Sequence, residues 1–155
     1  MTVFIRGAIA ALGGLFVYAS HEPVGWFIAG IVGTALLYIS LAPWGHGSRV
    51  GRSGRVAAGP TIAQGMLFGF IHGLTQYLLL LPWIGEFVGN LPYIALAVVL
   101  ALYSIALCAG GVALARWRRW GAFLFPLFYV AVEYLRSSWP FGGFAWVRLA
   151  WGQIN

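Results

Sequence analysis

The sequence contains no lysine, and its only acidic residues are Glu22, Glu86 and Glu133. Charged residues make up 8% of the 155 residues, and hydrophobic residues make up 61%. Because soluble globular domains carry about 25% charged residues, this composition excludes a soluble domain. The single cysteine, Cys108, excludes an internal disulfide. Glycine and tryptophan, with 22 and 8 copies, are favoured in and around membrane helices, so we expect an all-α integral membrane protein.

Five apolar segments are each close to the length of about 20 residues that a helix needs to cross a bilayer. They lie near residues 3–20, 24–42, 61–81, 93–115 and 121–136. Five of the seven prolines fall at the ends of these segments, namely Pro23, Pro43, Pro60, Pro82 and Pro92, and the connections, including the one from Pro82 to Pro92, are expected to be short loops. The sequence therefore predicts about five transmembrane helices in a single domain over residues 1–155. We expect the first helix to be retained and not cleaved as a signal peptide, because further spans follow it.

Arginine is distributed unevenly among the connections. Seven of the nine arginines lie near the N-terminus or in the second and fourth connections, namely Arg6, Arg49, Arg52, Arg55, Arg116, Arg118 and Arg119. The positive-inside rule assigns these connections and the N-terminus to the cytoplasm, so residues 137–155 are expected to face outward. Topology and contact with anionic membrane lipids explain the net charge of +6 better than nucleic acid, which we do not expect as a partner.

Other small and polar residues within the segments fit helix packing. Gly65, Gly69 and Gly73 recur every four residues and predict close contact between helices. His72 and Gln76 share a face of the same segment, and a lone histidine of this kind is more often a hydrogen-bonded packing residue than a ligand. The histidines lack metal-ligand spacing, and the glycine-rich second connection lacks the lysine of a phosphate-binding loop. We therefore expect no metal site and no cofactor.

Two charged residues stand at the end of the fifth segment. Glu133 and Arg136 are three residues apart and can pair on one face of a helix. Charge near the hydrocarbon boundary is costly and marks either an ion pair that fixes the helix end or a functional site. In the second interpretation, Arg136 binds a phospholipid phosphate, for which its planar fork is well suited.

A glycine- and aromatic-rich loop follows these charges. Gly142 and Gly143 allow a tight backbone bend. Phe144, Trp146 and Trp151 offer an aromatic surface for acyl chains at the membrane interface. The sequence thus predicts a lipid-contacting surface just beyond the fifth segment.

These motifs resemble the membrane part of apolipoprotein N-acyltransferase, a bacterial family that adds an acyl chain to lipoproteins. In that family, a Glu-aromatic-Leu-Arg helix end leads to a Gly-Phe-Pro-Trp loop and an aromatic-Ser-Gln element. The corresponding stretches in this sequence are residues 133–136, 143–146 and 151–153. Residues 69–73 and 81–84 also resemble the family's Gly-Phe-x-x-Gly span and the Trp-Ile loop after it. Two departures affect the rigidity of the loop: Ala145 replaces the Pro of the motif, and Gly152 replaces the Ser.

The resemblance implies a multi-pass protein of the bacterial cell membrane with a nitrilase-like domain on the outer face. It implies that a cysteine takes an acyl group from a phospholipid and passes it to the N-terminal diacylglyceryl-cysteine of a lipoprotein. A glutamate base and a lysine support that chemistry. The lipid- or substrate-binding residues that the resemblance implies for this chain are Glu133, Arg136, Gly143, Phe144, Trp146 and Gln153, and it assigns no catalytic residue.

The catalytic triad of the family cannot be present here, because the chain has no lysine and its one cysteine lies within an apolar segment. We therefore expect the chain to be inactive alone, with residues 137–155 leading to an extracytoplasmic domain that is missing. The alternative is a membrane anchor for a polyprenyl-phosphate mannose synthase. Such a glycosyltransferase partner would contact the arginine-rich connections at 45–59 and 116–119.

Overall fold

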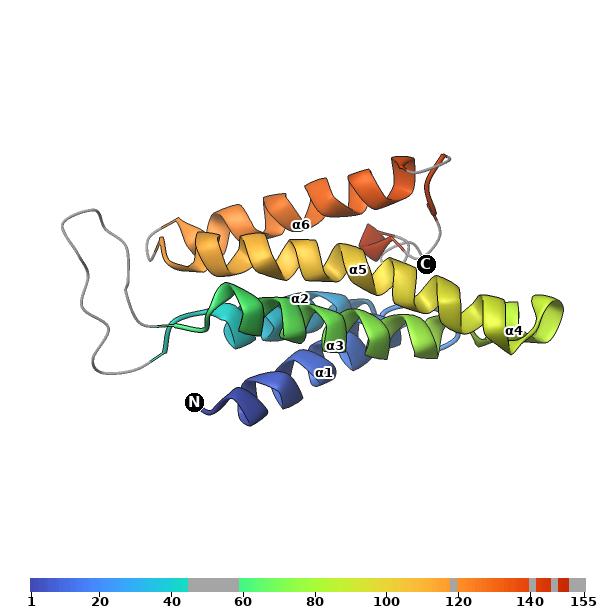
Figure 1. Cartoon of the computed structure of the whole chain (residues 1–155), viewed down its shortest axis with the longest axis horizontal. Helices are drawn as coiled ribbons and strands as arrows, with labels where there is room; N and C mark the ends of the chain where they lie inside the picture. The colour runs from blue at the N-terminus through green and yellow to red at the C-terminus, as the bar shows by residue number, and fades with distance from the viewer. Residues whose placement is uncertain (45–58, 118–119, 140–141, 146–147, 151–155) are drawn as a thin grey trace.

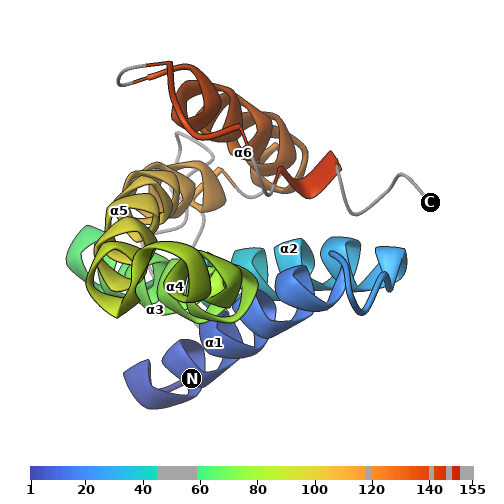
Figure 2. The same cartoon turned by 90° about the vertical axis from the view of Figure 1, so that its right-hand side faces the viewer.

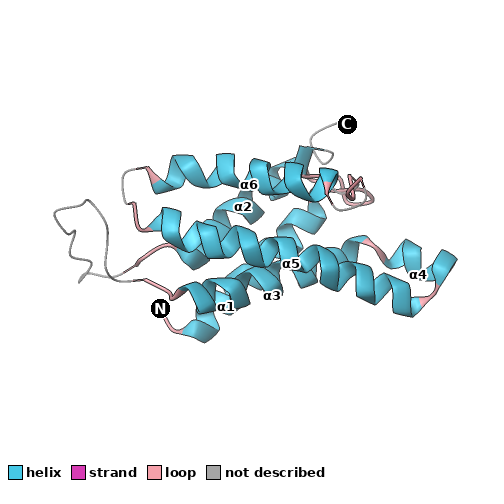
Figure 3. Cartoon of the chain, turned by 45° about the horizontal axis from the view of Figure 1, so that its top comes forward, coloured by secondary structure: helices cyan, strands magenta, loops and turns pink. Residues whose placement is uncertain are grey.

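The computed structural model describes residues 1–44, 59–117, 120–139, 142–145 and 148–150. Its elements are six α-helices, namely α1 (Val3–Ala19), α2 (Phe27–Leu41), α3 (Ile62–Leu80), α4 (Pro82–Val88), α5 (Asn90–Ala115) and α6 (Gly121–Ser138). The five long helices run side by side, and the short α4 lies at one end of the bundle (Figure 1). Short connections join the helices in the described part of the chain (Figure 3). The predicted all-α fold is confirmed.

Each long helix coincides with one predicted segment, with ends that differ by at most three residues. The region from Pro82 to Pro92 is the exception, because it was expected to be a loop and instead holds α4 and the start of α5. Pro82 occupies the first turn of α4, where a missing N–H is harmless. Gly89 separates the two helices with a φ of 99°, and Pro92 lies in the first turn of α5. Proline at these positions starts helices, and the loop prediction was wrong.

Local capping explains where two of the helices begin. The Thr2 hydroxyl accepts a hydrogen bond from the Ile5 N–H at 3.4 Å at the start of α1. At the start of α3, Thr61 and Gln64 form a capping box, in which each side chain accepts from the backbone N–H of the other residue. These caps satisfy N–H groups that the first turn of a helix leaves without partners.

The long helices pack around one shared core. Viewed along the bundle, α1, α2 and α3 lie together, α5 packs against α3, and α6 packs against α5 (Figure 2). Leu37 of α2, Phe68 of α3, Val112 of α5 and Phe125 of α6 belong to one buried cluster. All five long helices therefore contribute to, or pack around, a common apolar centre, with α6 in little direct contact with α2.

The glycine face of α3 is the tightest contact in the bundle. A Cβ atom added to Gly69 would overlap the backbone carbonyl oxygen of Ser104 on α5. On Gly73 it would lie 2.6 Å from the Ser104 hydroxyl, and on Gly65 it would overlap Val112. The predicted packing role of these glycines is confirmed, because no larger residue allows α3 and α5 to approach this closely.

A buried arginine joins the start of α1 to the end of α2. The Arg6 side chain is 6% exposed, and its Nη1 donates to the carbonyl oxygens of Ser40 at 2.7 Å and Ala42 at 2.8 Å. The last carbonyls of a helix have no partner within that helix, and a positive charge near them is favourable. Arg6 of α1 therefore caps the C-terminal end of α2, and it also places a positive charge at this end of the bundle.

The two ends of the bundle differ in charge, as the alternation of loops predicts. The N-terminus and the ends of α2 and α5 lie at one end, and α4 with the ends of α1, α3 and α6 lies at the other (Figure 1). Arg6 and Arg116 therefore belong to one end, while Glu22, Glu86 and Glu133 belong to the opposite half. The clusters at 49–55 and 118–119 lie outside the described residues. The assignment of one end to the cytoplasm stays a prediction.

The outer surface of the bundle carries many large apolar side chains. Phe4, Leu91 and Phe123 are 86%, 81% and 72% exposed. Of the described helices, α5 alone is long and apolar enough to cross a membrane, and α3 with α4, which meet at 58°, qualify together as a second span. Helices α1 and α2 are apolar but shorter. The five predicted segments are thus confirmed as helices, while the number of helices that cross the membrane stays a prediction.

We expect Gly69→Ala to lower the thermal unfolding midpoint of the purified chain, because the added methyl group meets backbone that cannot move away. Overpacking of this kind costs about 1–3 kcal/mol. Circular dichroism during heating measures the change. Gly7→Ala is the matched control, since its Cβ would make an ordinary 3.6 Å contact with Ile71. Equal midpoints for the two variants would contradict the packing role.

We also expect Arg6→Ala to destabilise the chain, because two carbonyls at the end of α2 lose a charged donor. A hydrogen bond to a charged group contributes about 1.5–3 kcal/mol to the free energy of unfolding. Urea unfolding in detergent micelles measures the loss. Arg116→Ala removes the same charge from the same end of the bundle and should have a smaller effect. The role of Arg6 would be disproved by a loss no greater than that of Arg116→Ala.

Candidate functional site

Glu133 and Arg136 lie together near the C-terminal end of α6. Arg136 Nη2 is 3.7 Å from Glu133 Oε1, and the side chains are 2% and 16% exposed. The ion pair expected from their spacing is therefore present. Removing one partner of a buried ion pair leaves an uncompensated charge and is strongly destabilising, so each residue keeps the other in place.

The Arg136 side chain points into the bundle. Its guanidinium carbon lies 5.6 Å from the centre of the Tyr77 ring on α3, a cation–π distance. A cavity of about 20 Å³ adjoins it, lined by Tyr77, Ser104, Tyr129 and Glu133 among others. That space is close to the size of one water molecule. The end of α6 is thus fixed by contacts with α3 and α5.

The loop after α6 turns back onto the helix. Gly142 and Gly143 have φ values of 90° and 71°, which confirms the tight bend expected from these glycines. A Cβ on Gly143 would overlap the Ser137 backbone, so the close approach also requires glycine there. The Phe144 N–H then donates to the Arg136 carbonyl oxygen at 2.9 Å. This bond caps the helix and fixes the direction of the loop.

Residues 148–150 return to the same end of the bundle and are held from two sides. The Leu149 N–H donates to Glu133 Oε1 at 2.9 Å. On the other side, His21 Nε2 is 3.0 Å from the Arg148 carbonyl oxygen, and His21 Nδ1 is 2.9 Å from the Val17 carbonyl oxygen. Glu133 therefore has two partners, and His21 connects the end of α1 to this segment.

His21, Arg148 and Leu149 were not identified as site residues from the sequence. His21 and Arg148 are 127 positions apart, and a histidine at a helix end has many possible roles. Leu149 contributes through its backbone N–H, which every residue except proline has. The sequence shows only that Glu133 is a carboxylate, which can accept several hydrogen bonds, and it does not name the donors.

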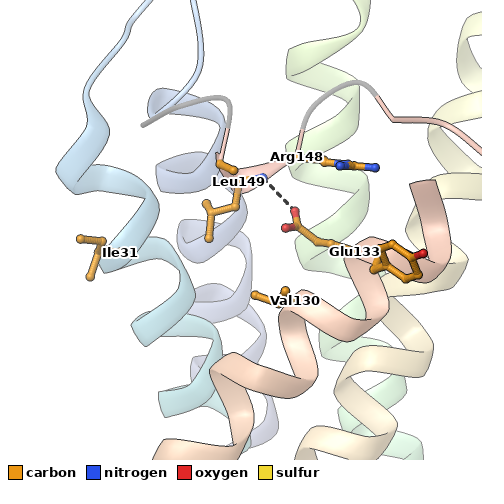
Figure 4. Close-up of a pocket in the computed structure, with 7 residues that line it drawn as sticks. Ile31, Val130, Glu133, Arg148 and Leu149 are labelled. Atoms are coloured by element: carbon orange, nitrogen blue, oxygen red, sulfur yellow. Dashed lines mark hydrogen bonds between the residues drawn. The ribbon is translucent and has the colours of Figure 1, made fainter. Parts of the chain in front are cut away.

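A mostly apolar groove opens beside the charged pair. Its volume is about 460 Å³, and its walls are Ile31 of α2, Val130 and Tyr134 of α6, and residues 148–150. Glu133 and Arg148 are its charged lining residues. The Leu149 side chain lies between α2 and α6, and the Glu133 carboxylate is directed toward the Leu149 backbone N–H (Figure 4). An amphiphilic molecule with a polar end would match this distribution.

The other predicted site residues take different positions. Gly143 forms the bend, and Phe144 is partly buried against a cluster that includes Tyr77 and Leu81. Trp146 and Gln153 lie outside the described residues. The lipid- or substrate-binding roles of the predicted site residues therefore stay predictions.

The remaining polar residues of the helices have packing positions. His72 is 1% exposed, and its Nδ1 lies 3.2 Å from the Ala10 carbonyl oxygen, as expected for a packing histidine. Cys108 is completely buried in α5. Glu86 is exposed on α4. In the described part of the chain, no three His, Cys, Asp or Glu residues come together as metal ligands would.

The fold and the site define an all-α domain with an apolar exterior and a charged pair buried at the end of its last helix. The family model described as apolipoprotein N-acyltransferase N-terminal domain matches residues 13–155, and the chain belongs to this family. That assignment confirms the resemblance found in the motifs.

Two relatives carry the name apolipoprotein N-acyltransferase. The one from Mycolicibacterium smegmatis is 35% identical over 115 residues, which cover 72% of this chain and 17% of the relative. The one from Aquifex aeolicus is 37% identical over 95 residues, which cover 57% of this chain and 22% of the relative. The matched part of the chain thus spans about a fifth of the length of these relatives.

We expect Glu133→Ala to release the segment 148–150, because the Leu149 N–H loses its acceptor. Loss of a hydrogen bond to a charged acceptor corresponds to about tenfold or more in an opening equilibrium. Amide hydrogen exchange at Leu149 measures the change. Glu133→Gln keeps an acceptor oxygen but removes the charge opposite Arg136, so its effect on exchange should be smaller.

Glu86→Ala provides the control, since that exposed carboxylate lies on α4. It should leave Leu149 exchange unchanged. If Glu133→Ala exchanges at the wild-type rate, the carboxylate does not hold this segment.

Proposed function

We propose that this chain is the membrane portion of an apolipoprotein N-acyltransferase. Its role is to embed the enzyme in the bacterial cell membrane and to hold the phospholipid acyl donor near a catalytic domain on the outer face. The observation that supports this most is that the family match continues through Glu133, Arg136 and the loop after them. These residues build the end of the bundle where an apolar groove meets buried charge.

The exterior of the bundle supports a multi-pass arrangement. A helix group with exposed apolar side chains on most sides is stable only in an apolar surrounding. The five long helices would each cross the bilayer, with the N-terminus in the cytoplasm. Arg6 and Arg116 would then lie near the anionic inner surface, and the Glu133 end would lie near the outer surface.

The side chains of this chain indicate that it contributes to lipid binding and that the nucleophile lies elsewhere in the enzyme. The outer end of the bundle is built by Glu133, Arg136, Gly143 and Phe144. Trp146 and Gln153 follow these residues in the sequence. In the chemistry that the family implies, a reactive thiolate carries the acyl group, yet Cys108 is completely buried in α5, and the chain has no lysine. The nucleophile that takes the acyl group from a phospholipid and gives it to a lipoprotein must therefore belong to another part of the enzyme.

The alternative role as an anchor for a glycosyltransferase has no support in the names of the relatives. It also leaves the charged pair and the groove at the opposite end of the bundle without a function.

The first test is the intact mass of the native polypeptide purified from its own membranes. We expect a mass several-fold above 16.8 kDa, with an outward-facing Glu, Lys and Cys in the additional sequence. A mass near 16.8 kDa would overturn the proposal.

A second measurement examines activity directly. Membranes that contain only the 155-residue chain should transfer no acyl group to a diacylated lipoprotein, as followed by mass spectrometry of its N-terminal peptide. The enzyme from Mycolicibacterium smegmatis serves as the positive control. Transfer by the 155-residue chain would show that the argument from the missing nucleophile is wrong.

A further inference from the structure

The groove beside Glu133 continues along the seam between α2 and α6. A second cavity of about 430 Å³ shares Ile31 and Leu149 with the first and extends past Thr34 of α2 to Pro126 of α6. Each cavity falls within the range of about 300–1,000 Å³ that small-molecule sites occupy. Together they make up an apolar groove that begins at the charged end of the bundle and narrows at Leu149, which lines both cavities. We call this the α2–α6 groove.

The charges at the head of the α2–α6 groove favour an anion. Glu133 faces two arginines, Arg136 and Arg148, which leaves one positive charge in excess. Arg136 is 2% exposed and engaged by Glu133 and Tyr77. Arg148 lines the groove itself, and within the described chain its buried Nε has no hydrogen-bond partner. A buried donor without a partner costs free energy that an acceptor from a ligand would restore.

The backbone at this position is rigid enough to hold a ligand. Contacts on two sides, from His21 to the Arg148 carbonyl oxygen and from Glu133 to the Leu149 N–H, hold the peptide unit between Arg148 and Leu149. A side chain on a fixed backbone loses less entropy on binding than one on a free loop.

We propose that the α2–α6 groove holds one acyl chain of a phospholipid and that Arg148 binds the phosphate of the same molecule. This inference rests on the proposed function and gives it a specific site. It assigns the headgroup contact to Arg148, which lines the groove. Arg136 does not line the groove, and its role is to pair with Glu133. Guanidinium suits this contact because its planar fork matches phosphate oxygens.

An acyl chain fits the α2–α6 groove better than a protein helix does. A helix with its side chains is about 10–12 Å across, while the Leu149 side chain projects between α2 and α6 (Figure 4) and lines both cavities of the groove. A flexible hydrocarbon chain can pass such a narrowing. The groove between α1 and α3 provides a contrast, because its volume is about 600 Å³ but no charged residue lines it.

The test uses the 155-residue chain in detergent micelles with added phosphatidylglycerol, and native mass spectrometry counts the bound lipid. Arg148→Gln should weaken binding about tenfold, through the loss of charge-assisted hydrogen bonds. Ala35→Trp fills the α2–α6 groove and should abolish binding. Ala8→Trp makes the same change in the groove between α1 and α3 and should leave binding unchanged. Circular dichroism confirms that each variant is folded.

A photoreactive group on the acyl chain of the same lipid locates the bound molecule. Crosslinks on α2 and α6 near Thr34 and Pro126 support the proposal. Unchanged affinity in Arg148→Gln, equal losses in the two tryptophan variants, or a dimer mass that Ala35→Trp removes would each overturn it. Because lipid is counted without acyl transfer, binding that persists while the native polypeptide proves to be only 16.8 kDa would overturn the proposed function alone.

Discussion

The close contact between α3 and α5 is the constraint on which the rest of the bundle depends. Because Gly69 and Gly73 carry no side chain, Ser104 of α5 lies directly against the α3 backbone. One turn after Gly73, Tyr77 of α3 lies under Arg136 of α6 at 5.6 Å, and Ser104 of α5 lines the same small cavity as these two residues. The close contact of α3 with α5 thus adjoins the place where the charged pair of α6 is held. Packing of this kind is a main source of attraction between helices where water supplies no driving force.

Among the described charged residues of this sparsely charged chain, Arg6 and Arg136 are buried and Glu133 is 16% exposed, and each is stabilised differently. Arg6 uses the unpaired carbonyls at the end of α2. Glu133 accepts from a backbone N–H and faces Arg136, which also rests on an aromatic ring. All three lie near helix ends, where backbone groups lack intrahelical partners. A charge buried in the middle of a helix would have no such groups to contact, so helix ends are where buried charge is least costly.

The sequence predicted the long helices well and the site only in part. Apolar segments bounded by prolines determine the helices in any apolar surrounding, and the i, i+3 spacing of Glu133 and Arg136 determines their pairing. The helix α4 was missed because proline both ends and begins helices, and only the backbone angle at Gly89 distinguishes the two cases. His21 and Leu149 were missed because their contacts are long-range and involve backbone atoms, which leave no pattern of side chains.

The departure from the family motif at Ala145 is understandable from these long-range contacts. Proline at that position would restrict the loop through its own ring. In this chain, the Phe144 N–H is bonded to the end of α6, and the peptide units after Arg148 are held by His21 and Glu133. The loop is thus fixed on both sides of Ala145 without the ring. Hydrogen bonds therefore supply the constraint here, and those of Arg148 and Leu149 lie at the head of the groove between α2 and α6.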